Sequence, residues 1–252
     1  MLYGFIGTGA ITEAIVVGLS EQVSEAPPVA LSPRNAGVAA DLAARFPNVT
    51  VCSSNADVVD AADVVVLAVR PQDAVAALSA LPFRPTQTVI SVMAGLSIDA
   101  VSRLVAPATR VVRAIPLPEV ARRSGMVPVH PFDGDAKALF ERVGQVVFPP
   151  TEAALDAHSA VTAVVAGHLD YLDSVSGWLA DQGVPPAEAR RYVATIFREL
   201  SAGLDGEIPF AEMADRYATA GGINEQMRLL TSAEVRGIMR QALSQVLTRI
   251  ST

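Results

Sequence analysis

The first 115 residues alternate short apolar runs with amphipathic stretches of helical period. The longest apolar run, residues 64–69, is rich in valine, which is typical of a parallel strand buried on both faces. Strands are predicted over residues 2–6, 29–32, 49–52, 64–69, 89–92 and 111–115. Helices are predicted over residues 12–21, 36–45, 72–81 and 98–105. This alternation predicts an α/β fold with a doubly wound parallel sheet.

The pattern changes at Pro149 and Pro150. Before them, peripheral strands are expected over residues 126–129 and 145–148, around a helix at 136–143. After them the strand pattern stops, and helices are predicted over residues 152–182, 186–204, 210–218 and 224–250. The sequence therefore predicts an α/β domain over residues 1–150 and an all-helical domain over residues 151–252. Because the helical part carries more apolar positions than it can bury alone, we expect a homodimer through it.

A glycine-containing turn joins the first predicted strand to the first predicted helix. Residues 5–12 are Phe-Ile-Gly-Thr-Gly-Ala-Ile-Thr. Gly7 would make the tight turn, and Gly9 would let the backbone approach a pyrophosphate, which the N-terminus of the new helix would attract. Thr12 stands where Gly or Ala is usual in this fingerprint. The alternative is an ordinary tight turn, which only the structural context separates from a nucleotide site.

The second predicted strand ends in Ser32, Pro33, Arg34 and Asn35, with no acidic residue for the ribose hydroxyls of NAD. Arg34 is placed to bind a 2′-phosphate, with Ser32 and Asn35 as helpers, which favours NADP(H) over NAD(H). The alternative is a loop arginine that faces water. The segments after the fourth and fifth strands would form walls around the cofactor. The expected cofactor-binding residues are Gly7, Thr8, Gly9, Ala10, Ile11, Ser32, Arg34, Asn35, Asn55, Ala68, Val69, Arg70, Pro71, Ala94 and Gly95.

Composition and charge limit the classes of partner that we expect for this protein. The net charge is −7 without a basic cluster, so we expect no nucleic-acid partner. No apolar segment reaches the roughly 18 residues of a membrane span, and we expect no membrane partner and a cytoplasmic location. The single cysteine, Cys52, indicates neither an internal disulfide nor a thiolate metal site, and no metal is expected. Cys52 is interpreted as a small core residue.

Several motifs are similar to those of a known enzyme family. They are residues 4–9 (Gly-Phe-Ile-Gly-Thr-Gly), 54–55 (Ser-Asn), 61–72 (ending Ala-Val-Arg-Pro-Gln, where the family typically has Ala-Val-Lys-Pro-Gln), 91–95 (Ser-Val-Met-Ala-Gly) and 110–116 (Arg-Val-Val-Arg-Ala-Ile-Pro). On these the chain resembles the pyrroline-5-carboxylate reductase family. The resemblance implies a Rossmann-type domain that binds NAD(P)H and a helical domain that dimerises. It also implies hydride transfer to the C=N carbon of a small cyclic imino acid, giving proline.

The substrate half departs from the family pattern. Residues 115–119 are Ile-Pro-Leu-Pro-Glu in place of Met-Pro-Asn-Thr-Pro, and residues 219–224 are Thr-Ala-Gly-Gly-Ile-Asn in place of Ser-Pro-Gly-Gly-Thr-Thr. The second of these is the family's loop around the substrate carboxylate. The resemblance therefore implies substrate binding by Pro116, Gly221, Gly222 and Asn224. Two alternatives stay open: a reductase of another small C=N or C=O substrate, and a non-catalytic NADP-binding or regulatory protein.

Reduction of an imine also needs a proton source or hydrogen-bond donors near the nitrogen. The candidates for this catalytic role are Asn224, His168 and Tyr171. Asn224 would alternatively be the N-cap of the last helix. His168 is a candidate because a histidine side chain can donate a proton, and Tyr171 follows it by three positions on one helix face. A structural role for His168 is the alternative. A β-hydroxyacid dehydrogenase is disfavoured because its interdomain helix needs a lysine, and no lysine follows Lys137.

Overall fold

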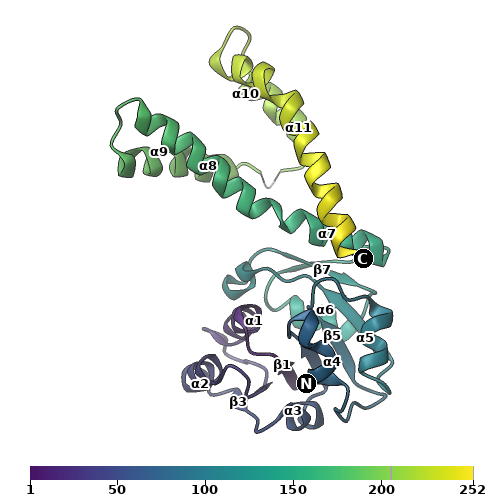
Figure 1. Ribbon diagram of the computed structural model, residues 1–252. Coiled ribbons are helices and arrows are strands. Elements are labelled where there is room, and N and C mark those ends of the chain that lie inside the picture. The colour runs from purple at the N-terminus through teal and green to yellow at the C-terminus, as the bar shows by residue number, and fades with distance from the viewer. Residues whose placement is uncertain (205, 252) are drawn as a thin grey trace. The chain divides into compact units, whose positions relative to one another are not determined.

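The computed structural model describes residues 1–204 and 206–251. The chain divides into two compact units (Figure 1). The first comprises Met1–Ser159 together with the residues from Arg249 onward, and the second comprises Ala160–Thr248. The first unit thus continues past residue 150, where we placed the domain boundary. The two units are described separately below.

Within the described residues, an eight-stranded sheet forms the centre of the first unit. Its strand order is β3-β2-β1-β4-β5-β6-β7-β8, and neighbouring strands are parallel except for β6 and β7. The strands are β1 (Tyr3–Ile6), β2 (Val29–Leu31), β3 (Val49–Val51), β4 (Val64–Leu67), β5 (Thr88–Ser91), β6 (Arg110–Ala114), β7 (Met126–His130) and β8 (Gln145–Val147). The predicted doubly wound α/β fold is confirmed.

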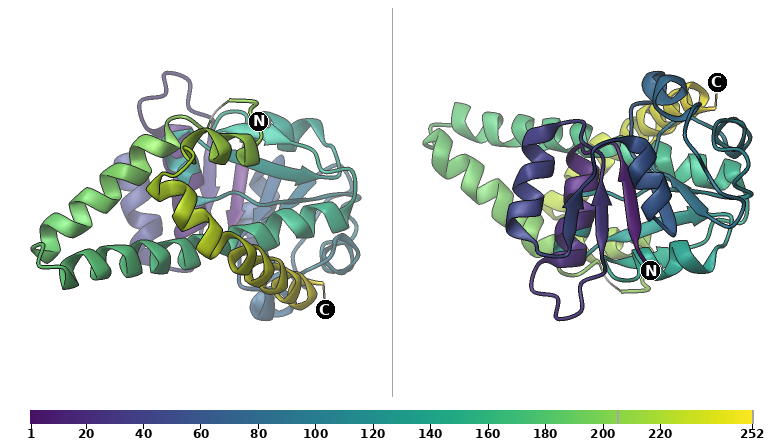
Figure 2. Two further views of the ribbon diagram at one scale, coloured as in Figure 1. Left: turned by 90° about the horizontal axis from the view of Figure 1, so that it is seen from above. Right: turned by 90° about the horizontal axis from the view of Figure 1, so that it is seen from below.

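Helices cover both faces of this sheet (Figure 2). One face carries α1 (Ala10–Ser20), α2 (Ala36–Arg45) and α6 (Gly134–Phe140), and the other carries α3 (Asn55–Ala61), α4 (Ala74–Leu78) and α5 (Ile98–Leu104). Side chains of a strand point alternately to the two faces. Phe5 and Val66 therefore belong to one core, whereas Ile6 and Leu67 belong to the other. A strand between two cores must be apolar at every position, which explains the valine run of β4.

Short 3₁₀ helices account for two differences from the predicted elements. The helix predicted over residues 72–81 begins instead with η1 (Pro71–Asp73), followed by the shorter α4. No element was predicted at η2 (Pro118–Arg122), which packs against α1. The approach is so close that a Cβ at Gly18 of α1 would collide with the carbonyl oxygen of Val120.

Cys52 follows β3 and is partly buried against the second core. Burial, with a smaller contribution from the nearby Asp57 carboxylate, raises the pKa of the Cys52 thiol. The thiol therefore stays protonated at neutral pH and is a weak nucleophile, which agrees with the packing role expected for it.

The helical unit has a small buried core. The predicted helix over residues 152–182 divides into α7 (Glu152–Thr162) and α8 (Val164–Asp181). After these come α9 (Pro186–Ser201), α10 (Phe210–Tyr217) and α11 (Ile223–Ile250). Among the described residues of this unit, the buried hydrophobic side chains are Ala160, Ala189 and Val193. Among the described residues, no helix is both long and apolar enough to cross a membrane. The expected cytoplasmic location stays a prediction.

A buried ion pair joins the sheet to the beginning of α7. Arg113 of β6 has a side chain only 5% exposed, and its Nη1 donates to Glu152 Oε1 at 2.7 Å. Its Nη2 lies 2.9 Å from Asp156 Oδ1. The same Glu152 oxygen accepts from the backbone N–H of Ile98 at 2.8 Å, at the start of α5. The Arg113 guanidinium is withdrawn from water and depends on the two carboxylates for compensation, whereas Glu152 and Asp156 keep 31% and 15% of their side chains exposed.

We expect Arg113→Ala to lower the free energy of unfolding by about 3 kcal/mol, because it leaves two carboxylates at a buried site without their cation. Urea denaturation followed by circular dichroism measures this loss. Lys137→Ala is the matched control, since Lys137 and Glu141 form an exposed pair at 3.6 Å and the expected loss is below about 0.5 kcal/mol. Equal losses in the two variants would contradict a stabilising role for the Arg113 pair.

Candidate functional site

The turn after β1 has a backbone that only glycine permits. Gly7 has a φ of +95°, and a Cβ there would lie 2.6 Å from the carbonyl oxygen of Ala68, at the end of β4. The Gly7 N–H donates to Ser32 Oγ at 2.9 Å, and Thr8 Oγ1 donates to the Ser32 carbonyl at 3.0 Å. The turn is therefore held between the ends of β2 and β4.

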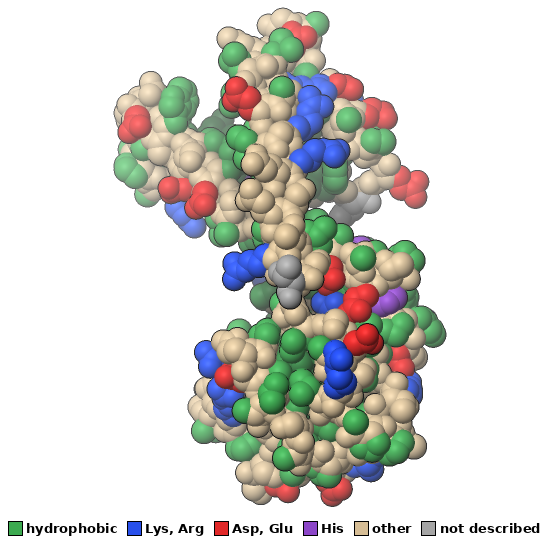
Figure 3. Space-filling model, turned by 45° about the vertical axis from the view of Figure 1, so that its right-hand side comes forward, with side chains coloured by type: hydrophobic (Ala, Val, Ile, Leu, Met, Phe, Trp, Pro, Cys, Tyr) green, Lys and Arg blue, Asp and Glu red, His purple; other side chains and the backbone are tan. Residues whose placement is uncertain are grey.

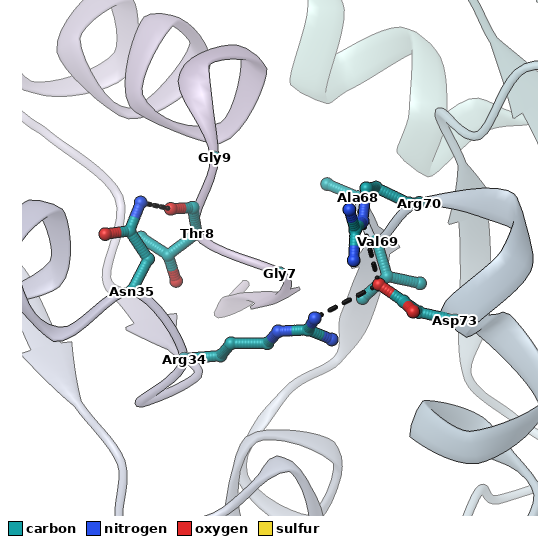
Figure 4. Close-up of a pocket in the computed structure, with 9 residues that line it drawn as sticks. All are labelled: Gly7, Thr8, Gly9, Arg34, Asn35, Ala68, Val69, Arg70 and Asp73. Carbon is teal, nitrogen blue, oxygen red and sulfur yellow. Dashed lines mark hydrogen bonds and ion pairs between the residues drawn. The ribbon is translucent and has the colours of Figure 1, made fainter.

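Two more side chains hold the same turn. Thr12 is fully buried, and its Oγ1 donates to the Gly7 carbonyl at 2.6 Å. This hydrogen bond gives a physical reason for threonine at a position where we expected a smaller residue. Asn35 Nδ2 donates to the Thr8 carbonyl at 2.9 Å (Figure 4). Asn35 itself has a φ of +62°, a conformation that asparagine tolerates better than most residues.

A pocket of about 150 Å³ opens over this turn. Its lining residues are Gly7, Thr8, Gly9, Arg34, Asn35, Ala68, Val69, Arg70 and Asp73 (Figure 4). Gly9 differs from Gly7, because its φ is −101° and a Cβ there would have no atom within 4 Å. No neighbouring atom would clash with a larger side chain at this position. The effect of glycine here is therefore to leave the mouth of the pocket open. The first N–H groups of α1, from Ala10 onward, have no partner within the helix, as a bound anion requires.

Charged side chains cross one side of this pocket. Arg34 Nη2 lies 3.1 Å and Arg70 Nε 2.9 Å from the same oxygen, Asp73 Oδ2 (Figure 4). These hydrogen bonds, that of Arg70 above all, hold the pKa of the Asp73 carboxyl below its usual range. Sequence reasoning missed Asp73, which reaches the pocket from η1, and gave Arg34 no partner. The only sign of this role for Asp73 in the sequence is that it follows Arg70 by three positions.

The remaining cofactor candidates lie around the pocket without lining it. Ser32 is buried beneath the turn, and Ala10 and Ile11 begin α1. Asn55 begins α3, and its Nδ2 donates to the Ala77 carbonyl at 3.4 Å. Pro71 begins η1, and the exposed Ala94 and Gly95 follow β5. All of them come after the carboxyl ends of strands or at the helix starts that follow, and their contact with a cofactor stays a prediction.

The candidates of the helical unit form a second group. The rings of His168 and Tyr171 on α8 stack with centroids 6.2 Å apart, and each packs edge-on against Phe197 of α9. Phe197 also lines a mainly apolar cavity of about 670 Å³ that includes Asn224. Phe197 thus contributes to both the ring cluster and the cavity. Neither ring of the pair is buried.

The glycine loop before α11 already uses its backbone donors. The N–H of Gly221 donates to Glu225 Oε2 at 2.8 Å, and the N–H of Gly222 donates to the Thr219 carbonyl at 2.8 Å. Asn224 is not the N-cap of the last helix, as one interpretation had it, because α11 begins at Ile223. The other substrate candidate, Pro116, is buried after β6 in the first unit.

No metal centre accompanies these groups in the part of the chain that the structure describes. Among the described residues, no three His, Cys, Asp or Glu side chains come together in a way that could hold a metal ion.

Comparisons with known proteins agree with this geometry. The family model described as NADP oxidoreductase coenzyme F420-dependent matches residues 2–95. The pyrroline-5-carboxylate reductase of Synechocystis is 30% identical over 234 residues, which cover 87% of this chain and 85% of that protein. The 1-pyrroline-5-carboxylate reductase of Streptococcus pyogenes has a TM-score of 0.83 at 20% identity, covering 100% of this chain and 98% of that one. A Plasmodium falciparum pyrroline carboxylate reductase with NADP bound has a TM-score of 0.78 at 17% identity, covering 100% and 97%.

The open space at Gly9 yields a test of the anion site. We expect Gly9→Asp to weaken nucleotide binding about a hundredfold, because a carboxylate would meet the diphosphate at the pocket mouth. The melting temperature should stay level or rise, since aspartate is a favourable N-cap for α1. Isothermal titration calorimetry and thermal unfolding measure the two effects.

Gly9→Asn is the matched control, because it adds nearly the same volume at the same cap without charge. We expect its affinity to lie between those of wild type and Gly9→Asp. Unchanged nucleotide affinity in the folded Gly9→Asp protein would contradict an anion site at this turn.

Proposed function

Because the chain belongs to the pyrroline-5-carboxylate reductase family, whose members are NAD(P)H-dependent oxidoreductases, we propose that it reduces the C=N bond of a small cyclic imino acid with NADPH. The proposed reaction converts pyrroline-5-carboxylate to proline. The observation that carries the proposal is the glycine turn under an open pocket at the carboxyl ends of β1 and β4. Doubly wound sheets bind their ligands at this edge.

The cofactor would be held by three parts of this edge. The turn from Gly7 to Gly9 and the first N–H groups of α1 would bind the diphosphate. Arg34 would bind the 2′-phosphate, helped by Ser32 and Asn35, which is the basis for preferring NADP(H) to NAD(H). When bound, the reduced nicotinamide supplies a hydride to the imine carbon. The protein contributes placement and exclusion of water.

The proposed substrate-binding residues are Pro116 in the first unit and, in the helical unit, Gly221, Gly222 and Asn224. In this proposal the Asn224 amide donates to the imino acid, and His168 or Tyr171 supplies the proton for the imine nitrogen. His168 suits the task because an imidazole can both donate and accept a proton. Phe197 supports both rings by edge-on packing, which fixes the face that they present.

One contact favours a second candidate substrate. The Gly221 N–H, which would otherwise be available for a substrate carboxylate, donates to the Glu225 side chain. A substrate carboxylate would have to displace Glu225 and would be repelled by it. A cyclic imine without a carboxylate avoids this conflict. Reduction of such an imine is therefore the second candidate function.

A comparison of two imines tests both candidates. The first substrate is pyrroline-5-carboxylate, and the second is 1-pyrroline, the same ring without the carboxylate. We expect the purified chain to oxidise NADPH in the presence of pyrroline-5-carboxylate. The loss of reduced-nicotinamide absorbance measures this oxidation. Glu225→Gln should raise kcat/KM for pyrroline-5-carboxylate about tenfold by removing the like charge, and should leave kcat/KM for 1-pyrroline unchanged.

Each result of this assay decides something. Faster turnover of 1-pyrroline than of pyrroline-5-carboxylate would favour the second candidate. Tight NADPH binding with no oxidation by any imine or ketone would overturn both and leave the alternative of a non-catalytic NADP-binding or regulatory protein.

We also propose a homodimer through the helical unit. Large hydrophobic side chains are exposed over its helices (Figure 3), and among them Ile223 is 84% and Leu229 is 79% exposed. Monomeric proteins seldom leave so many large apolar groups in water, and a second copy of the chain supplies the matching surface.

Sedimentation equilibrium should give twice the chain mass of 26.3 kDa. Leu229→Glu should shift the equilibrium toward the monomer, because a charge would enter the apolar contact. Gln22→Glu, at an exposed position of the first unit, adds the same charge outside the proposed contact and should leave the mass unchanged. A monomeric wild-type protein at micromolar concentration would refute the dimer.

A further inference from the structure

Asp73 is a carboxylate inside a pocket whose other groups suit an anion. Its side chain is 24% exposed, whereas those of Arg34 and Arg70 are 59% and 67% exposed. The acid therefore lies deeper in the site than the guanidinium groups that it binds. Both arginines donate to Oδ2, and among the described residues Oδ1 accepts no hydrogen bond.

The two guanidinium groups converge from opposite sides of the pocket (Figure 4). Arg34 follows β2, and Arg70 follows β4. Two guanidinium groups on one oxygen form the arrangement that binds a phosphate, whose charge is about −1.5 to −2 at neutral pH. Here the shared anion is the protein's own carboxylate.

We propose that Asp73 is an internal anion that competes with the 2′-phosphate of NADPH for Arg34 and Arg70, and thereby sets the discrimination between NADPH and NADH. The inference rests on the proposed nucleotide site. To bind NADPH, Arg34 must exchange the carboxylate for the phosphate, and the displaced carboxylate stays nearby as a like charge. NADH has a 2′-hydroxyl at this position and meets no such competition.

Asp73 also offers NADH a favourable hydrogen bond. In dinucleotide folds an acidic residue accepts hydrogen bonds from the ribose hydroxyls, and it usually comes from the end of the second strand. Here β2 ends without an acid, and Asp73 brings one from η1 to the same pocket. With Oδ2 held by the arginines, Oδ1 is available to accept from a ribose hydroxyl. One carboxylate thus disfavours the phosphate and favours the hydroxyl.

The experiment compares dissociation constants for NADPH and NADH, and for the half-molecules 2′,5′-ADP and 5′-AMP, by calorimetry at low salt. The half-molecules isolate the adenosine end from any chemistry at the nicotinamide. The variants are Asp73→Asn, Arg34→Ala and the double variant. Asp60→Asn is the charge-matched control, since the Asp60 side chain is 88% exposed on α3 and lies 3.9 Å from Arg84.

We expect Asp73→Asn to tighten NADPH about tenfold relative to NADH, and 2′,5′-ADP to the same extent relative to 5′-AMP. The gain should shrink at high salt and in the Arg34→Ala background, because it acts through that guanidinium. Asp60→Asn should leave both ratios unchanged.

Two failures are distinguishable. If wild-type protein binds neither dinucleotide, the proposed function fails and the inference falls with it. If wild-type protein binds the dinucleotides and Asp73→Asn leaves the preference for NADPH over NADH unchanged or lowers it, the inference alone is overturned. The contacts of Asp73 with Arg34 and Arg70 are then only surface ion pairs.

Discussion

The conformation of the turn at Gly7 is the constraint on which the rest of the pocket depends. The absence of a Cβ lets the turn rest on the Ala68 carbonyl. The Ser32 hydroxyl accepts from the Gly7 N–H, and Thr12 and Asn35 donate to the carbonyls of Gly7 and Thr8. With the backbone fixed in this way, α1 must begin at the pocket, and its first N–H groups keep no intrahelical partner. The anion site is therefore a consequence of how β1 ends.

Strand register brings the other parts of the site to this turn. Phe5 of β1 lies opposite Leu31 of β2 on one side and Val66 of β4 on the other, so these strands end at nearly the same level. The residues that follow them, although far apart in sequence, must then meet at one edge of the sheet. Apolar side chains on both faces hold that register, because a slip by one residue would exchange the two cores.

Local patterns were sufficient to predict this scaffold. The eight strands agree with their predicted ranges to within two residues at each end. The central strands β1, β4 and β5 were the plainest, because a doubly buried parallel strand is an apolar run bounded by turn residues. The glycine turn was equally readable, since its residues are contiguous. The break between α7 and α8 at Ala163 was not predicted, and the surrounding alanines and valines carry no helix-ending residue.

What the sequence could not reveal are contacts between residues distant in the chain. The Arg113 pair joins β6 to α7 across 39 residues, and the Arg34–Asp73 pair spans the same separation. No periodicity encodes either one. Thr12 illustrates a subtler case, in which a residue that is unusual for the fingerprint supplies a hydrogen bond that a smaller one would lack.

The position of Asp73 bears on how dinucleotide folds are interpreted from sequence. The usual rule infers the cofactor from the last residue of the second strand, where an acid indicates NAD and an arginine indicates NADP. That rule assumes that β2 alone supplies the groups around the adenosine ribose. In this sheet β4 lies on the far side of β1 from β2, yet the loop after it reaches the same pocket and contributes both a cation and an acid. Charge in this pocket is therefore the sum over two loops, and Arg34 has to be weighed together with Arg70 and Asp73.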